Sequence, residues 1–232
     1  MDLEKMFEMQ KALDERIIKE KGLEGQDLLS NLILALQVEL AECANEWRGF
    51  KHWSNNQEPR KKLSTTVGAT PENAAFFRCE SDDCGEYLNK EDFKNLFDPD
   101  YEECPICKVG CVTAFRDTNP LLEEYVDCLH FILSIGNRID YLKNNQSVDE
   151  LKRTTTKGTG VYAFMDVFNA IVYLNDEVTG STIDNELAHY FYENLFLRFN
   201  ALGENLGFTL EQIEAAYMEK NAVNHQRQQE GY

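Results

Sequence analysis

Two groups of side chains in this sequence have the types and spacing to bind metal ions. The first is acidic: Glu39, Glu42 and Glu46 recur at steps of three and four, and Glu124 and Asp127 lie three apart. At about 100° per residue, acids at these steps share one face of a helix. Both segments are otherwise apolar, and a carboxylate beside a core is unfavourable unless it is paired or bound to a cation. Because hard divalent cations prefer oxygen ligands, the two segments predict a Mg²⁺ site where their helices pack together.

Two other interpretations of these acids are open. Glutamates at helical steps are also common on solvated helix faces, although the apolar neighbours of both segments argue against a fully solvated face. A di-iron site is the nearest metal alternative, and it would need a pair of acid-x-x-His motifs. Asp127 and His130 form one such motif, and Glu186 with His189 has the same spacing. The pair of Glu39 and Glu42 carries only carboxylates, so we favour Mg²⁺ over iron.

The second group consists of cysteine pairs. Four residues separate Cys79 from Cys84, two separate Cys104 from Cys107, and 19 residues lie between the pairs. Two close thiolate pairs at this separation are typical of a tetrahedral Zn²⁺ site. A bound metal would supply folding energy to a segment too small for much core. Loose thiols or a redox pair are the alternatives, and Cys111 could replace one of the four ligands.

Apolar periodicity predicts helices separated by polar breaks. The predicted helices cover residues 1–20, 27–48, 119–142, 161–178, 181–203 and 209–228. Pro120 fits the first turn of its helix, and Gly203 is a helix-stop signal. Between the second and third helices the sequence is first polar and then rich in cysteine. These features predict an all-α bundle formed by residues 1–54 and 119–232, with an inserted zinc-ribbon-like module at residues 55–118.

The composition narrows the class of protein. The chain has 232 residues, a hydrophobic fraction of 43% and a formal net charge of −18. No apolar run reaches the length of a membrane span, and the acidic N-terminus lacks the apolar centre of a secretory signal. Seven cysteines, an odd number, disfavour a disulfide framework. We therefore expect a soluble, cytoplasmic protein that binds neither membranes nor nucleic acid, because nucleic-acid affinity depends on Lys and Arg.

The insert is acidic as well. From Phe76 to Thr118, five Lys and Arg face eleven Asp and Glu. That balance argues against contact with a phosphate backbone. Contact with a protein partner, a lid over the substrate or reinforcement of a dimer fits the insert better.

Several stretches together resemble a known enzyme family. "ELAE" at residues 39–42, followed by "EYVDCLHF" at residues 124–131, is similar to the acid pattern of the all-α nucleoside triphosphate pyrophosphohydrolases. "FEMQKALDERI", "FKHWS" and "YMEKNAVNHQRQQEGY" narrow the resemblance to the dimeric dUTPases of phages, bacteria and trypanosomatids. The resemblance covers about residues 1–53 and 119–232, and nothing in the family's pattern matches residues 55–118.

The resemblance implies a metal-dependent reaction. Glu39, Glu42, Glu124 and Asp127 match the family's Mg²⁺ ligands, and Glu46 is a weaker candidate for contact with a metal or water. In this family the metals clamp the triphosphate and help to activate a water, which attacks between the α- and β-phosphates of dUTP. The products are dUMP and pyrophosphate, and one of the acids could serve as the base.

Contacts with the nucleotide are implied for other segments. The matching positions are Gln10, Lys51, Trp53, His130, Lys220, Asn224, Arg227 and Tyr232. Gln10 and Trp53 would hold the uracil by hydrogen bonding and stacking, with Trp47 as the alternative stacking residue. His130 matches the residue beside the deoxyribose. Lys220, Asn224 and Arg227 would meet phosphates or sugar, and Tyr232 would close the site. The resemblance also implies a homodimer whose subunits both shape the site.

Two alternatives to dUTP hydrolysis remain at this stage. A related enzyme could prefer dCTP or a modified deoxyuridine triphosphate, because base choice depends on a few side chains. A catalytically silent member could instead act as a regulatory or protein-binding module through the zinc insert. The complete set of acids argues against the second alternative.

Overall fold

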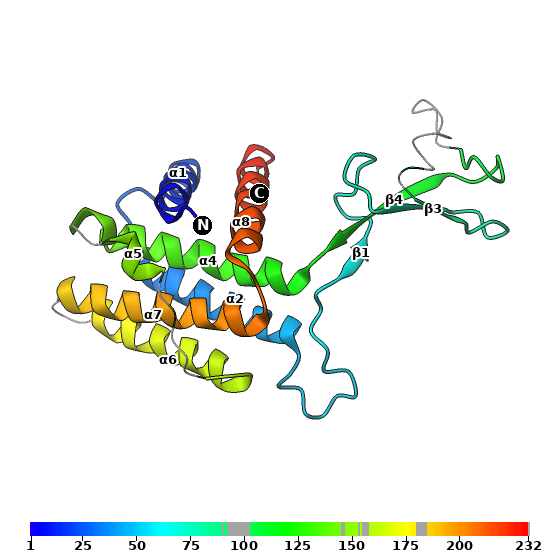
Figure 1. The fold of residues 1–232 in the computed structure, drawn as a ribbon. Coiled ribbons are helices and arrows are strands. Elements are labelled where there is room, and N and C mark those ends of the chain that lie inside the picture. Colours follow the sequence, from blue (N-terminus) through cyan, green and yellow to red (C-terminus); the bar gives the residue numbers. More distant parts are fainter. Residues whose placement is uncertain are drawn as a thin grey trace. The chain divides into compact units, whose positions relative to one another are not determined.

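The computed structural model describes residues 1–89, 91, 103–144, 147–152, 154, 158–179 and 185–231. The chain divides into two compact units, one formed by Met1–Pro59 with Leu121–Tyr232 and the other by Arg60–Pro120. The first unit is helical and the second contains a small sheet (Figure 1). In the described part of the chain, no helix combines the length and apolarity needed to cross a membrane.

The helical unit is built from long amphipathic helices. Their bounds are α1 (Leu3–Lys21), α2 (Leu29–Trp47), α4 (Pro120–Arg138), the 3₁₀ helix η1 (Tyr141–Asn144), α5 (Val148–Leu151), α6 (Val161–Val178), α7 (Asn185–Leu206) and α8 (Leu210–Gln229). Local signals set several of the ends. Asp2 caps α1, Gly22 ends it in the left-handed conformation, and Thr209 with Gln212 forms a capping box at α8. These helices confirm the predicted all-α class.

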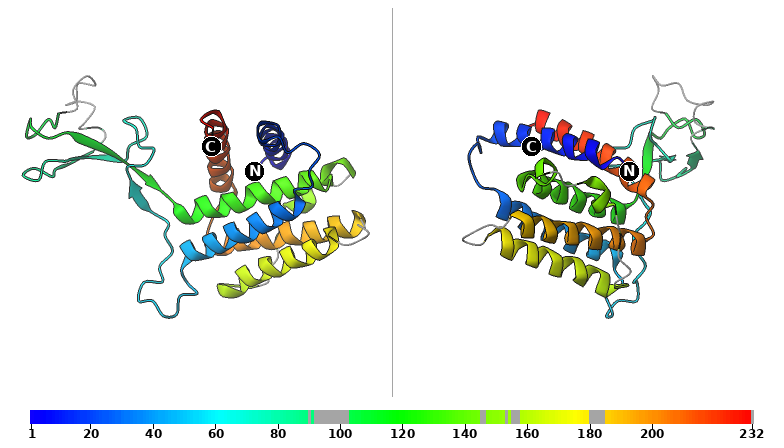
Figure 2. Two further views of the ribbon diagram at one scale, coloured as in Figure 1. Left: turned by 180° about the vertical axis from the view of Figure 1, so that it is seen from behind. Right: turned by 60° about the vertical axis from the view of Figure 1, so that its left-hand side comes forward.

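Helix α4 lies in the middle of the helical unit. Figure 2 shows α1 and α8 on one side of it, and α2 and α7 on the other with α6 beyond them. Eleven residues of α4 are buried, so most of its surface contacts other helices. On α4 the ring of Tyr125 stacks on Phe199 of α7 with centroids 4.2 Å apart, and its hydroxyl donates to the Phe199 carbonyl. This packing fixes α4, the helix that carries Glu124 and Asp127, against α7.

Two predicted helix ends differ from the structure. Helix α4 ends at Arg138 rather than near Leu142, because Asp140 has a positive φ of 52° and the chain continues as η1. Helix α7 passes through Gly203 and ends at Leu206, where Gly207 takes the positive φ. A Cβ on Gly203 would lie 2.5 Å from the Tyr125 hydroxyl oxygen. Gly203 therefore gives room to a core ring, and it does not stop the helix.

The second unit contains a four-stranded antiparallel sheet. Its strands are β1 (Leu63–Thr65), β2 (Phe76–Cys79), β3 (Tyr87–Asn89) and β4 (Val112–Thr118), in the order β1-β4-β2-β3. Strand β1 falls within the polar segment that precedes the cysteines. The buried apolar cluster of this unit consists of Ala74, Phe77 and Leu88. So small a cluster leaves the unit in need of another source of stability.

Candidate active site and metal centres

Helices α2 and α4 bring three acids together. Ligand oxygens of Glu39, Glu42 and Glu124 all lie within 4.8 Å of one another. Asp127 follows one turn later on α4, and one of its carboxylate oxygens lies 2.5 Å from the Lys220 Nζ of α8. Glu46 is half-buried one turn further along α2 and is not part of the group of three. The spacing that the sequence shows on each helix thus becomes a cluster because the two helices pack face to face.

The acids are crowded enough to disturb one another's ionisation. Burial raises the pKa of Glu124 to about 7, and the charges of Asp127, Glu42 and Glu39 act in the same direction. Burial is also the main cause that raises the pKa of Glu39 and of Asp127, and Lys220 opposes it at both. Like charges this close are unfavourable without a counter-ion. The oxygen donor set and its excess of negative charge therefore fit a divalent cation.

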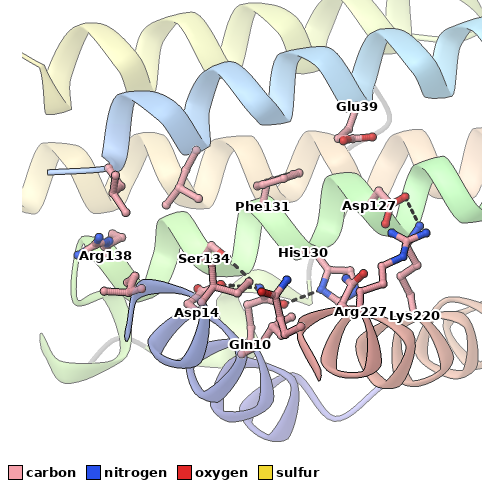
Figure 3. Close-up of a pocket in the computed structure, with 17 residues that line it drawn as sticks. Gln10, Asp14, Glu39, Asp127, His130, Phe131, Ser134, Arg138, Lys220 and Arg227 are labelled. Carbon is pink, nitrogen blue, oxygen red and sulfur yellow. Dashed lines mark hydrogen bonds and ion pairs between the residues drawn. The ribbon is translucent and has the colours of Figure 1, made fainter. Parts of the chain in front are cut away.

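A cavity of about 430 Å³ lies beside this acid cluster (Figure 3). Its lining is Gln10, Leu13, Asp14, Ile17, Ile18, Leu28, Leu32, Glu39, Asp127, His130, Phe131, Ser134, Arg138, Lys220, Asn224, Arg227 and Gln228. Figure 3 shows Glu39 and Asp127 at one end and Arg138 at the other. The predicted residues of α8 line the cavity together because steps of four and three place them on one helix face. The cavity volume falls within the range of small-molecule sites.

Gln10 lies in the cavity wall and is buried at 3% exposure. Its Nε2 donates to the Asp14 carboxylate at 2.8 Å and to the Ser134 hydroxyl at 3.0 Å. Its Oε1 lies 2.6 Å from His130 Nδ1 and 3.1 Å from the Tyr217 hydroxyl, whose single hydrogen it shares with the Met6 carbonyl at 3.0 Å. Both ends of the amide are therefore engaged within the chain.

The remaining predicted substrate residues are not among those that line the cavity. Trp53 is 67% exposed and packs edge-on against Phe50 and His52, and Lys51 lies over the Phe50 ring. Trp47, the alternative stacking residue, packs against Phe164 with ring centroids 5.1 Å apart. Tyr232 lies outside the described residues.

Several residues of the site were not singled out from the sequence. They are Asp14, Phe131, Ser134, Arg138 and Tyr217. A signal for two of them existed, because Asp14 follows Gln10 by four residues and Ser134 follows His130 by four. Each pair therefore shares a helix face. Burial raises the pKa of Asp14 to about 6, and its hydrogen bonds to Ser134 and Gln10 oppose that rise.

The four predicted thiolate ligands also come together, within the second unit. Sγ atoms of Cys79, Cys84, Cys104 and Cys107 all lie within 4.8 Å of one another. Two of the S–S separations are 3.7 and 3.9 Å. Zn–S bonds of about 2.3 Å in a tetrahedron place sulfurs roughly 3.8 Å apart. Cys111 is exposed and is not part of this group.

Backbone features around the thiolates fit a metal knuckle. The amides of Ser81 and Gly110 point at the sulfurs of Cys79 and Cys107, each at 3.4 Å. A Cβ on Gly110 would lie 2.6 Å from the Cys79 sulfur, so only glycine fits there. Gly85 has a positive φ of 56°, as a tight turn requires. The chemistry and the geometry of this cluster are thus compatible with Zn²⁺.

Comparison with known families gives a match that covers the helical unit and, beyond the predicted limits of the resemblance, also β1 and β4 from Thr113 onward. Residues 2–66 and 113–232 match the model of a dUTPase family. The chain belongs to this family of all-α dUTPases. It is accordingly a dUTP diphosphatase, an enzyme that hydrolyses dUTP. The match leaves out residues 67–112, which include the four clustered cysteines. A search of curated proteins found no match.

Proposed function

We propose that the chain cleaves dUTP to dUMP and pyrophosphate with Mg²⁺ held by Glu39, Glu42, Glu124 and Asp127. The convergence of acids from α2 and α4 beside the cavity is the observation that carries this proposal. When bound, Mg²⁺ would neutralise charge on the triphosphate and lower the pKa of an attacking water. The acids themselves hold the cation and fix the end of the cavity where the phosphates lie.

The protein supplies the other charges that the reaction needs. Lys220 and Arg227 extend from α8 next to Asp127 (Figure 3), and in this proposal they meet the phosphates. Asn224 on the same face meets phosphate or sugar. One acid of the site takes the proton of the attacking water, and Glu46 on the next turn of α2 is a candidate for contact with that water.

The deoxyuridine moiety occupies the rest of the cavity in this proposal. Gln10 and His130 line it, and Phe131 offers a ring in its wall. The contacts of Lys51, Trp53 and Tyr232 with the nucleotide stay predictions from the resemblance. Trp53 would have to reach the nucleotide from a position outside the cavity lining.

The first experiment is pyrophosphate release from dUTP, dCTP, dTTP and dATP with Mg²⁺. The native chain is compared with Glu39→Gln and Asp127→Asn, and Glu123→Gln is the matched control on α4. Selective cleavage of dUTP that the first two variants abolish and the control keeps would support the proposal. Equal activity in Glu39→Gln and the native chain would overturn the acid assignment. Hydrolysis in ¹⁸O-labelled water then shows whether the label enters dUMP or pyrophosphate, which identifies the phosphorus that is attacked.

We also propose that Cys79, Cys84, Cys104 and Cys107 bind one structural Zn²⁺. The sulfur separations and the two amides directed at sulfur support this assignment. Metal analysis of the purified chain should give one zinc per chain, and Cys104→Ser should remove it. Cys111→Ser should keep it. Zinc retained in Cys104→Ser and lost in Cys111→Ser would reverse the assignment of these two cysteines.

We propose further that the chain forms a homodimer through α6. Its exposed face carries Tyr162, Met165, Val172 and Tyr173, which share one side of the helix. A helix face that exposes several large apolar side chains often marks a protein interface. Light scattering should give about twice the chain mass of 26.8 kDa. The double variant Tyr162→Glu/Tyr173→Glu should give the monomer mass, whereas Tyr87→Glu, on an exposed ring of the other unit, should not.

A further inference from the structure

His130 has one ring nitrogen with a short hydrogen bond and one with none. Nδ1 lies 2.6 Å from Gln10 Oε1, whereas Nε2 has no hydrogen-bond partner in the described part of the chain. The residue is 5% exposed and stacks on Tyr217 with ring centroids 4.4 Å apart. A buried polar atom that lacks a partner is unfavourable, so such an atom beside a cavity calls for an explanation.

The direction of the hydrogen bonds follows from one carboxylate. Above its pKa of about 6, Asp14 has only acceptor oxygens, so the Gln10 atom beside it must be the amide nitrogen. That choice turns Oε1 toward His130 and Tyr217. An amide oxygen carries no hydrogen, so the proton of this hydrogen bond belongs to His130 Nδ1. The neutral ring then has an unshared electron pair on Nε2.

Burial and the nearby Lys220 favour that neutral ring. Both lower the pKa of His130, to about 3. The ring is also fixed in position, because it is held by Gln10 on one edge and by Tyr217 on one face. Lys220 and Arg227 extend beside His130 from α8 (Figure 3). Nε2 is buried, so a nucleotide reaches it only if its phosphates draw Lys220 and Arg227 away from the His130 ring.

We propose that Gln10 and Asp14 are positioning residues that lock His130 in the Nδ1–H tautomer, so that Nε2 accepts a hydrogen bond from the deoxyuridine nucleotide. This inference rests on the proposed function. Two groups of the nucleotide supply a donor: N3–H of uracil and the 3′-hydroxyl of the sugar. Cytosine has no hydrogen on N3, so the first source would discriminate against dCTP. In either case Gln10 sets the chemistry of the pocket through His130, because its own amide is engaged within the chain.

The tautomer is measured first, without nucleotide. In protein labelled with ¹⁵N-histidine, NMR distinguishes protonated from unprotonated ring nitrogens, and His130→Phe identifies the signals of His130. At pH 8 we expect a protonated Nδ1 and an unprotonated Nε2. Asp14→Asn should yield a mixture of tautomers, because an amide allows Gln10 to turn around. Tyr217→Phe is the matched control, since it removes one donor to Gln10 and should leave the tautomer unchanged. A protonated Nε2 in the native chain would overturn the proposal.

Binding then identifies the donor. The probes are the slowly hydrolysed α,β-imido-dUTP and its N3-methyl and 3′-deoxy derivatives, each with Mg²⁺. One derivative should bind roughly tenfold to a hundredfold more weakly than the parent, because it leaves Nε2 unpaired. That difference should vanish in His130→Phe. A loss with the N3-methyl probe identifies the base, and a loss with the 3′-deoxy probe identifies the sugar. If both derivatives bind as well as the parent, or if the loss persists in His130→Phe, the proposal is wrong.

The NMR measurement does not depend on these binding assays or on activity. A chain that fails to cleave dUTP would therefore overturn the proposed function and leave the tautomer assignment intact.

Discussion

The acid cluster and the thiolate cluster are assembled in opposite ways. Glu39, Glu42 and Glu124 project from α2 and α4, which are each 19 residues long and packed into a large apolar core. The thiolates lie on turns and strand ends of a unit whose buried apolar cluster has three residues. The core positions the acids whether or not a cation is bound. The thiolates have far less apolar packing around them, so their ligand would be part of what stabilises that unit.

The acid cluster also differs from the thiolate cluster in the repulsion among its charges. The acids repel one another, and burial with this repulsion raises the pKa of Glu124 to about 7. The fold therefore maintains an arrangement that is unfavourable without a cation, which is common where a site is prepared for ligand binding. We expect metal removal to abolish activity at the first site and structure at the second. Each prediction below tests one side of that contrast.

Removal of the thiolate-bound metal should have the largest effect. Chelation should unfold residues 60–120 and leave the helices, because structural zinc contributes on the order of 10 kcal/mol to such small units. Hydrogen exchange would show loss of protection at the β2–β4 amides and retained protection in α4. The chelated protein must be shown to contain no metal, and Cys111→Ser is the control that should stay folded. If the β2–β4 amides stay protected in metal-free protein, the second unit does not depend on its metal. That result would contradict the contrast between the two clusters.

Substitution of an acid should impair catalysis and leave the fold intact. Glu124→Gln removes one oxygen ligand, so we expect kcat for dUTP to fall by about 10²–10³-fold. The free energy of unfolding without Mg²⁺ should stay the same or rise, because one repelling charge is gone. Glu123→Gln controls for changes in helix charge and should retain activity. A marked loss of stability in Glu124→Gln would mean that this acid supports the fold, as the cysteines do.

Sequence alone indicated the thiolate cluster and the acid pair on each helix, because these signals are local, whereas the meeting of the two acid pairs depends on how α2 and α4 pack. Helical steps place Glu39 with Glu42 and Glu124 with Asp127 on shared faces, and the cysteine spacing already indicates two knuckles. Packing between distant segments was not predictable in this way. Gly203 looked like a helix stop, and only its contact with Tyr125 explains why the helix continues.

The hydrogen-bond network of the cavity was equally hidden. Gln10 and Ser134 are 124 positions apart, and their contact depends on how α1 packs against α4. The sequence indicated Gln10 as a direct uracil contact. The structure shows an amide whose two ends are both engaged within the chain. The contact of Gln10 with uracil stays a prediction, and its partners within the chain could not be derived from residue type, because they depend on which groups the packing brings within reach.

A smaller effect is expected for Lys220, the cation beside the acid cluster. Its Nζ pairs with Asp127, and both side chains are mostly buried. Lys220→Met leaves a buried carboxylate without its partner, so we expect a loss of about 1–2 kcal/mol in stability and a higher KM for dUTP. Lys152→Met, which breaks the exposed pair with Asp149, should change stability by less than about 0.5 kcal/mol. Added Mg²⁺ should restore part of the stability of Lys220→Met, because it supplies positive charge at the same acids. Equal losses in the two variants would show that the pair beside the site is no stronger than a surface pair.

The smallest expected effect is a pH dependence of stability that arises from the acid cluster and not from the thiolates. Burial first, and then the charges of Asp127 and Glu42, raise the folded-state pKa of Glu124 from 4.5 to about 7. The folded chain therefore holds this proton more tightly than the unfolded chain does. The resulting stability is fully present below pH 4.5 and is lost as pH rises through 7. Because Glu124 is only half-buried, solvent screening reduces the contribution to about 1 kcal/mol.

Denaturant titrations at pH 5 and pH 8, with zinc bound and Mg²⁺ absent, should show a larger decrease in the free energy of unfolding for the native chain than for Glu124→Gln. Saturating Mg²⁺ should remove this difference between the two proteins in their loss of stability from pH 5 to pH 8, because the cation binds the ionised acids of the folded chain. If the stability of the two proteins changes equally with pH in the absence of Mg²⁺, the acids do not repel one another measurably in the folded chain. The contrast with the thiolates would then rest on the other stability measurements alone.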